Sequence, residues 1–258
     1  MSKSAFRFVL TIGILSFFAD FTYEGSRSIL GPYLLSLQAS AAVVGVVTGF
    51  GELLGYALRL VSGRFADATG RYWPTTIFGY VLQMASVPAL ALTESWPAAA
   101  ALIILERVGK AIRNPPRDVM LSHAAKRVGG YGWVFGMHEA LDQFGALCGP
   151  LAIAAVLAWR ADYRLAFAVL LLPAAINLSL VALARLIYPR PQDLDSTPPD
   201  LHAKGLPRVY WIYLAGAAIW GLGVGVHESI IPAAVAPMVA PERRASAFGL
   251  FTAVYGVA

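Results

Sequence analysis

Six apolar stretches, each close to the length of a membrane-crossing helix, follow one another in the first 187 residues of the sequence. A helix needs about 20 mostly apolar residues to cross the hydrocarbon of a bilayer. Charged residues make up only 14% of the chain, whereas a soluble domain usually has about 25%. The chain therefore has too little charge to coat itself against water, and the sequence predicts an all-α transmembrane fold. The stretches cover residues 8–37, 41–61, 75–92, 97–112, 132–159 and 165–187.

The remaining 71 residues divide into a polar segment and a second apolar region. Residues 188–207 are polar and rich in proline, which is typical of a solvated linker. A seventh apolar stretch covers residues 209–239, and an eighth starts near Ala245. We therefore predict a six-helix N-terminal bundle over residues 1–187, a cytoplasmic linker over 188–207 and a partial C-terminal bundle over 208–258.

The basic residues predict the orientation of the chain in the membrane. With the N-terminus in the cytoplasm, thirteen Lys and Arg residues fall on the inner side, and only Arg160 and Arg164 lie in an outer loop. This asymmetry follows the positive-inside rule, so the net charge of +5 reflects topology rather than binding to nucleic acid. We expect a multi-pass protein of the inner membrane.

Other chemistry finds little support in the sequence. The single cysteine, Cys148, excludes an internal disulfide, and the four histidines do not have the spacing of metal ligands. Sequence patterns of nucleophilic, zinc-dependent and phosphate-binding enzymes are also missing. The sequence predicts no enzyme, no metal and no cofactor.

The segment between the second and third stretches reads GRFADATGR, residues 63–71. Gly63 allows two helices to approach closely, and Gly70 allows a tight turn. Asp67 follows a helix and is placed to accept hydrogen bonds from backbone N–H groups or from an arginine such as Arg71. The pattern resembles the G-x-x-x-D-x-x-G-R loop of the major facilitator superfamily, which implies a cytoplasmic gate. The alternative is a short polar turn whose charges only fix topology.

The resemblance to this superfamily continues over residues 15–190. It includes the segments FADFTYEGSRSILGPYL, GELLGYALRLVSGRFAD, ERVGKAIRNPPRD and FGMHEALDQFGALCGP. It implies the six-helix N-terminal bundle of the major facilitator fold, and proton-coupled secondary transport of a small solute. An arginine in this part of the fourth helix is linked to proton coupling in the family, which implies that role for Arg107.

Charged residues inside the apolar stretches are the candidate lining of a transport cavity. Charges are costly in lipid and tend to mark function. The alternative is that they form structural ion pairs that fix the register of the helices. The candidates for solute binding and proton coupling are Asp20, Glu24, Arg27, Glu52, Arg59, Glu106, Arg107, Glu139 and Asp142.

Two further motifs extend these predictions. Pro115 and Pro116 are expected to end the fourth helix, because proline breaks the helical hydrogen-bond ladder. This would place Arg113, Arg117 and Asp118 near the inner surface, close to Asp67 and Arg71, as an inner-gate charge cluster or as plain surface charge. Gly145, Gly149 and Pro150 resemble the Gly-Pro motif of exporters in the superfamily, which implies close helix packing, a bend and outward transport.

The tail shows an imperfect repeat of the fourth and fifth stretches, as expected for halves related by duplication. It predicts a join near residues 216–219 between the start of a seventh helix and a tenth, with the helices between them missing. The alternative is an ordinary seventh span with a basic outer loop. Because alternating access needs two halves, we consider a transporter, a self-associating chain, and a non-transporting remnant or partner subunit. The expected partners are a small solute, protons and lipid.

Overall fold

The computed structural model describes residues 2–195, 209–219 and 221. The chain divides into two units, residues 1–198 and 199–258. In the second unit the described part is the short apolar helix Val209–Ile219. The first unit holds the helices α1 (Lys3–Ser36), α2 (Ala41–Thr69), α3 (Tyr72–Ala89), α4 (Trp96–Val128), α5 (Tyr131–Arg160), α6 (Tyr163–Val169) and α7 (Leu171–Ile187), with two short 3-10 helices, η1 (Leu90–Leu92) and η2 (Pro191–Leu194). The all-α prediction is confirmed.

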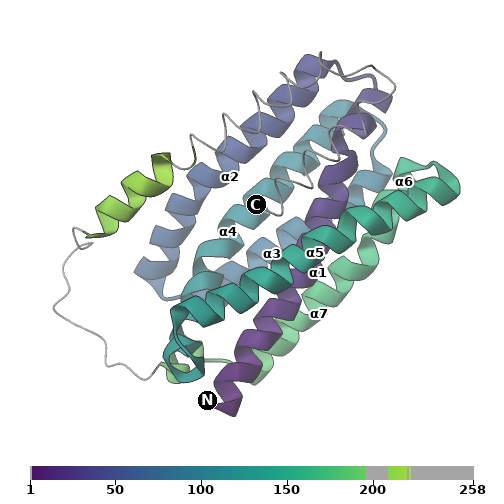
Figure 1. The fold of residues 1–258 in the computed structure, drawn as a ribbon. Coiled ribbons are helices and arrows are strands. Elements are labelled where there is room, and N and C mark those ends of the chain that lie inside the picture. The colour runs from purple at the N-terminus through teal and green to yellow at the C-terminus, as the bar shows by residue number, and fades with distance from the viewer. Residues whose placement is uncertain (1, 196–208, 220, 222–258) are drawn as a thin grey trace, which may run out of the picture. The chain divides into compact units, whose positions relative to one another are not determined.

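The long helices of the first unit form an up-and-down bundle (Figure 1). Helix α1 packs against α5 and α7, and α4 packs against α2 and α3. A backbone hydrogen bond from Ser2 to Arg127 ties the start of α1 to the end of α4. We call this end of the bundle, where α1, α3 and α5 begin and α2, α4 and α7 end, the basic end. It carries Lys3, Arg64, Arg71, Lys126, Arg127 and Arg185.

Five helical segments among the described residues are long and apolar enough to cross a membrane: α1, α2, α3 with η1, α5, and α6 with α7. The last pair is one span, Tyr163–Ile187, interrupted at Leu170. Helix α4 has 33 residues and is therefore also long enough to cross a membrane, but its charged residues lower its mean hydropathy. The bundle thus follows the predicted order of six stretches, with the charged one packed between α2 and α3.

The fourth helix does not end at Pro115 and Pro116, as the sequence predicts, but continues through both to Val128. Proline at position 115 has no N–H to donate to the carbonyl oxygen of Ala111. The hydroxyl of Ser62 on α2 takes the place of that donor, at 2.7 Å from the Ala111 oxygen in a buried position. The freed carbonyl is therefore satisfied from a neighbouring helix, which is how prolines are tolerated inside membrane helices.

The substitution Ser62→Ala should lower the free energy of unfolding by about 1–3 kcal/mol, because it leaves the buried Ala111 carbonyl without a donor. Unfolding of the purified chain by denaturing detergent, followed by circular dichroism, measures the change. Ser179→Ala is the matched control, since that exposed hydroxyl donates only to Ala175 in its own helix. Equal effects of both substitutions would contradict the role given to Ser62.

The first part of the predicted linker is docked on the bundle rather than solvated. The indole N–H of Trp73 donates to the Tyr188 carbonyl at 2.9 Å, and Pro191 and Leu194 are buried. At the end of this segment, Asp195 lies 3.3 Å from His123. Residues 196–207 lie outside the described part. The predicted join near residues 216–219 falls at the end of the described helix, and most of the repeat that suggested it lies outside the described residues.

Candidate functional site: a buried charge cluster

Helix α4 supplies the centre of the site. Glu106, Lys110, Arg113 and Arg117 follow one another at intervals of four, three and four residues, so they lie on one helical face. Arg107 lies beside them, and Gly109 lets α3 approach. A Cβ atom at Gly109 would lie 2.6 Å from the backbone nitrogen of Gln83, so α3 and α4 touch through their backbones here. This contact brings polar side chains of α3 next to the charges of α4.

Asp20 on α1 forms ion pairs with two basic residues of α4. Its Oδ1 atom lies 3.6 Å from the Lys110 ammonium and 3.5 Å from the Arg113 guanidinium. The Asp142 carboxyl group on α5 lies next to that of Asp20. Because two adjacent ionised carboxylates repel each other, one proton shared between them would stabilise this pair. Three helices therefore meet at one carboxyl pair and two cations.

Arg113 is fully buried and links Asp20 to a second carboxyl group. Its Nε donates to the Gln83 side chain at 2.6 Å, and its Nη1 donates to the Tyr80 hydroxyl at 3.1 Å. The amide nitrogen of Gln83 in turn donates to Glu106 at 3.2 Å. Gln83 thus bridges Arg113 and Glu106, and a continuous polar chain runs from α1 through α4 and α3.

Arg107 connects the same chain to α2. Its Nη2 lies 3.3 Å from Glu52, and its Nε lies 3.6 Å from Glu106. The ring of Tyr23 stacks under both cations, at 4.6 Å from the Arg107 guanidinium and 3.4 Å from the Lys110 ammonium. The Tyr23 hydroxyl donates to Glu52 at 3.2 Å. The Glu52 side chain is itself 36% exposed, so this series of polar contacts runs from the surface at Glu52 into the core of the bundle.

The cluster has an extension toward the basic end. Arg117 donates to Asp118 at 2.8 Å and to the Ser16 hydroxyl at 3.4 Å. The same hydroxyl lies 2.8 Å from Nε2 of His138 on α5. This extension joins α1, α4 and α5 one helical turn away from the Asp20–Asp142 pair.

The structure brings five of the nine predicted cavity residues into one cluster: Asp20, Glu52, Glu106, Arg107 and Asp142. The other four make contacts with other residues. Glu24 and Arg27 pair with each other at 3.3 Å, the Arg59 guanidinium stacks on Tyr56 at 4.6 Å, and exposed Glu139 accepts from Gln143.

The predicted inner-gate cluster is divided in the structure. Asp67 and Arg71 are exposed at the basic end, and the tight turn expected at Gly70 is left-handed, with a φ of 63°. Arg113 and Arg117 are buried instead of lying at the surface, because the face of α4 that carries them packs against α1 and α3. Asp118 stays with Arg117. A Cβ atom at Gly63 would make only ordinary contact with Pro115, at 3.5 Å, so that glycine is not required for this packing.

Gly145 and Gly149 lie where α5 meets α1. A Cβ atom at either position would overlap a backbone carbonyl of α1, that of Phe17 or that of Phe21. Pro150 follows within the same continuous helix. The small residues therefore set the distance between α1 and α5, the two helices that carry Asp20 and Asp142.

Sequence reasoning missed several members of the cluster. Lys110 is one of the thirteen basic residues that the sequence pattern assigns to the inner side of the membrane, yet only 17% of its side chain is exposed. Gln83 is a polar residue inside an apolar stretch, and His138 lies one turn before Asp142. Both could therefore have been recognised from the sequence as candidate members of the site. Nothing in the sequence distinguishes Tyr80 from the other tyrosines.

Three kinds of known proteins resemble this chain. Uncharacterized proteins of Mycobacterium tuberculosis and Mycobacterium bovis are 44% identical over 252 residues, which cover 92% of this chain and 61% of each relative. An uncharacterized MFS-type transporter of Methanocaldococcus jannaschii is 30% identical over 141 residues, 55% of this chain and 35% of that protein. The chain thus spans about 61% of the length of the mycobacterial proteins.

Solved structures show the same fold. A crystal structure of the peptide transporter POT in complex with sulfate matches with a TM-score of 0.61 at 18% identity, over 97% of this chain and 51% of that chain. An auto-inhibited POT family peptide transporter matches with a TM-score of 0.59 at 21% identity, over 86% of this chain and 48% of that one. The family model of the Major Facilitator Superfamily matches residues 12–209, more than three quarters of the sequence. The chain therefore belongs to the Major Facilitator Superfamily.

Proposed function

We propose that this chain works in a secondary active transporter that exports a small solute in exchange for protons across the inner membrane. The observation that carries the proposal is the polar face of the bundle beside the buried cluster. The side chain of Arg27 is 53% exposed, that of Glu52 is 36% exposed, and Glu139 is exposed as well. Such charges are costly in lipid, so this face belongs against a water-filled cavity or a second bundle.

The proton is assigned to the carboxyl pair Asp20–Asp142. Counted with its extension, the cluster holds five carboxyl groups (Asp20, Glu52, Glu106, Asp118 and Asp142) and four cations (Arg107, Lys110, Arg113 and Arg117). With every group ionised the cluster would carry one net negative charge, and the proton shared by the pair makes it neutral. A solute or a helix movement that separates the pair changes the affinity for that proton, which is the coupling that a transporter needs.

Orientation and direction rest on the sequence patterns. The excess of basic residues at one end of the bundle supports a cytoplasmic N-terminus. The exposed Asp67 and Arg71 at that end are the proposed gate, where they are accessible to partners from a second bundle. The likeness of Gly145, Gly149 and Pro150 to the Gly-Pro motif of exporters supports outward transport.

Asp142→Asn should abolish proton release on solute binding but leave solute binding itself intact, because asparagine donates to Asp20 without an exchangeable charge. Candidate solutes are first selected by the shift in melting temperature that they cause in the purified chain. Proton release is then measured with a pH-sensitive dye in weakly buffered detergent solution, and solute-driven flux with the same dye inside proteoliposomes. Asp162→Asn, at an exposed helix cap outside the cluster, is the isosteric control.

A solute that binds and crosses the membrane at a rate independent of the pH gradient would refute proton coupling and leave transport standing. Proton release that persists in Asp142→Asn at the level of the control would refute the assignment to this pair.

A partner subunit is the second candidate function. The observation that favours it is the weak burial of α2 and α5, whose apolar windows are each only 17% buried, so both helices offer a face to a second bundle. Two copies of this chain, or this chain and a different partner, would then surround the cavity. Cross-linking in native membranes tests the idea: covalent dimers are expected if copies pair, whereas solute transport by monomers in proteoliposomes would exclude that role.

A further inference from the structure

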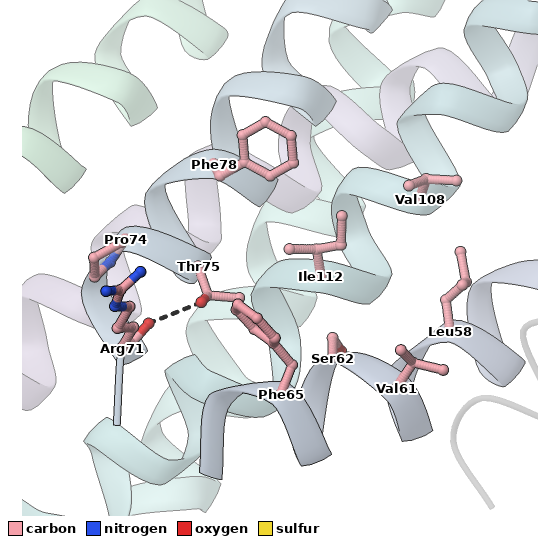
Figure 2. Close-up of a pocket in the computed structure, with 10 residues that line it drawn as sticks. All are labelled: Leu58, Val61, Ser62, Phe65, Arg71, Pro74, Thr75, Phe78, Val108 and Ile112. Carbon is pink, nitrogen blue, oxygen red and sulfur yellow. Dashed lines mark hydrogen bonds between the residues drawn. The ribbon is translucent and has the colours of Figure 1, made fainter. Parts of the chain in front are cut away.

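A groove on the outside of the bundle lies between α2 and α3, with α4 as its floor. Its volume is about 500 Å³. The two walls contact each other little, because each packs mainly on α4. Figure 2 shows Phe65, Val61 and Leu58 along α2 facing Phe78 of α3 and Ile112 and Val108 of α4. All six are apolar, and Leu58 and Val108 lie at the end away from Arg71.

A second, polar cavity of about 190 Å³ adjoins the groove at the basic end. The two cavities share Arg71 and Pro74 as lining residues. The polar cavity adds Arg185 at the end of α7 and Gln192 from η2. Both arginines are exposed. The first residues of α3, whose amino end favours negative charge, line the same cavity.

The dimensions match one leaflet of a bilayer. From Leu58 to Gly70 the wall of the groove rises along twelve residues of α2, or about 18 Å. Half of a hydrocarbon core that is about 30 Å thick is about 15 Å. Because the turn at Gly70 joins two spanning helices, the Arg71 end lies at the interface with water and the Leu58 end lies within the hydrocarbon.

We propose that the groove and the polar cavity together bind one anionic phospholipid. An acyl chain lies along Val61, Phe65 and Phe78, and the phosphate lies between Arg71 and Arg185. Guanidinium groups bind phosphate through two parallel hydrogen bonds, which a headgroup at this interface is placed to accept. The combination selects the ligand: an apolar channel open to lipid accommodates an acyl chain, and two adjacent cations select a headgroup with net negative charge.

The site is distinct from the charge cluster. Its lining comes from the outer faces of α2, α3 and α4, while Asp20 and Asp142 lie between α1, α4 and α5. The proposal does not rest on transport, since lipid binding is measured without any solute. The proposed lipid phosphate contacts Arg71, which belongs to the predicted gate segment 63–71.

Native mass spectrometry of the full purified chain, titrated with phosphatidylglycerol and with phosphatidylcholine, tests the proposal. Tighter binding of phosphatidylglycerol is expected. A basic residue near a membrane surface contributes about 1 kcal/mol, or about fivefold in affinity. The double substitution Arg71→Gln/Arg185→Gln should therefore weaken the binding of phosphatidylglycerol about 25-fold. It should also remove the preference for phosphatidylglycerol over phosphatidylcholine. Val61→Trp, which fills the groove, should weaken the binding of both lipids.

Two matched controls separate the site from general attraction to the surface. Arg64→Gln removes an exposed charge at the same end that lines neither cavity, and Val46→Trp adds an indole to an exposed position of α2 outside the groove. Both should retain full binding. A loss in Arg64→Gln as large as the loss in the single substitution Arg71→Gln or Arg185→Gln, or unchanged binding in Val61→Trp, would overturn the proposal. So would inorganic phosphate that displaces phosphatidylglycerol at equal concentration, since the polar cavity would then bind a free anion without the groove.

Discussion

Arg113→Met is expected to lower the free energy of unfolding by about 3–5 kcal/mol, the cost of removing one partner from a buried charge pair. The Arg113 side chain is fully buried and holds Asp20, Gln83 and Tyr80 at once. Methionine keeps the volume of the side chain but supplies no donor. Asp20 then keeps Lys110 but loses the closer of its two ion-pair partners, and the Gln83 oxygen loses its donor.

Unfolding by denaturing detergent, followed by circular dichroism, measures this loss in the purified chain. Arg64→Met is the matched control, because that arginine is exposed and its replacement should change the stability by less than about 0.5 kcal/mol. The double variant Asp20→Asn/Arg113→Met should lose less than the sum of the two single losses, since neither partner is then left charged and alone. Additive losses would show that the two residues do not act as a pair.

This expectation depends on a feature that the sequence pattern places wrongly. Two adjacent prolines normally stop a helix, so Arg113 was expected at the end of the fourth helix and near the surface. The helix continues instead, and the Ala111 carbonyl that Pro115 leaves free accepts from Ser62, 49 residues earlier in the sequence. Local sequence rules cannot detect such a contact between distant residues, nor the contacts with α1 and α3 that bury Arg113 and Arg117.

The fold itself was predictable because it depends on local composition. Long apolar stretches separated by short polar turns predict the helices 3–36, 41–69, 72–89 and 131–160 and the span 163–187; the largest error among these is at the second helix, which continues to Thr69 instead of ending at Val61. The left-handed turn at Gly70 was predictable for the same reason, since few residues other than glycine adopt that backbone conformation.

The site was predictable only in part. Charges inside apolar stretches are conspicuous, so Asp20, Glu106, Arg107 and Asp142 were identified without knowledge of the contacts. Their partners were not, because pairing depends on which helices are neighbours. Gln83 is the clearest example: it becomes a bridge between Glu106 and Arg113 only because α3 and α4 approach at Gly79 and Gly109.

The second large effect is expected at the contact between α1 and α5. Gly149→Ala should destabilise the chain by about 3 kcal/mol, the upper end of the usual cost of inserting a methylene into a packed core. The new methyl group would overlap the backbone carbonyl of Phe21 and lie 2.9 Å from the backbone nitrogen of Gly25. Backbone atoms of a helix cannot turn aside as a flexible side chain does, so α1 and α5 must separate. Separation also pulls Asp142 away from Asp20.

Gly136→Ala, on the same helix, is expected to have the opposite sign. A Cβ atom there meets nothing within 4 Å, and alanine is favoured over glycine in a helix by about 1 kcal/mol. Gly149→Ala and Gly136→Ala are the same chemical change, and unfolding in denaturing detergent should show opposite signs for their effects on the free energy of unfolding. Stabilisation by both would show that α1 and α5 are not held at this distance. Destabilisation by Gly149→Ala together with lost proton release would link the packing of these helices to the carboxyl pair, since no ionisable group is altered.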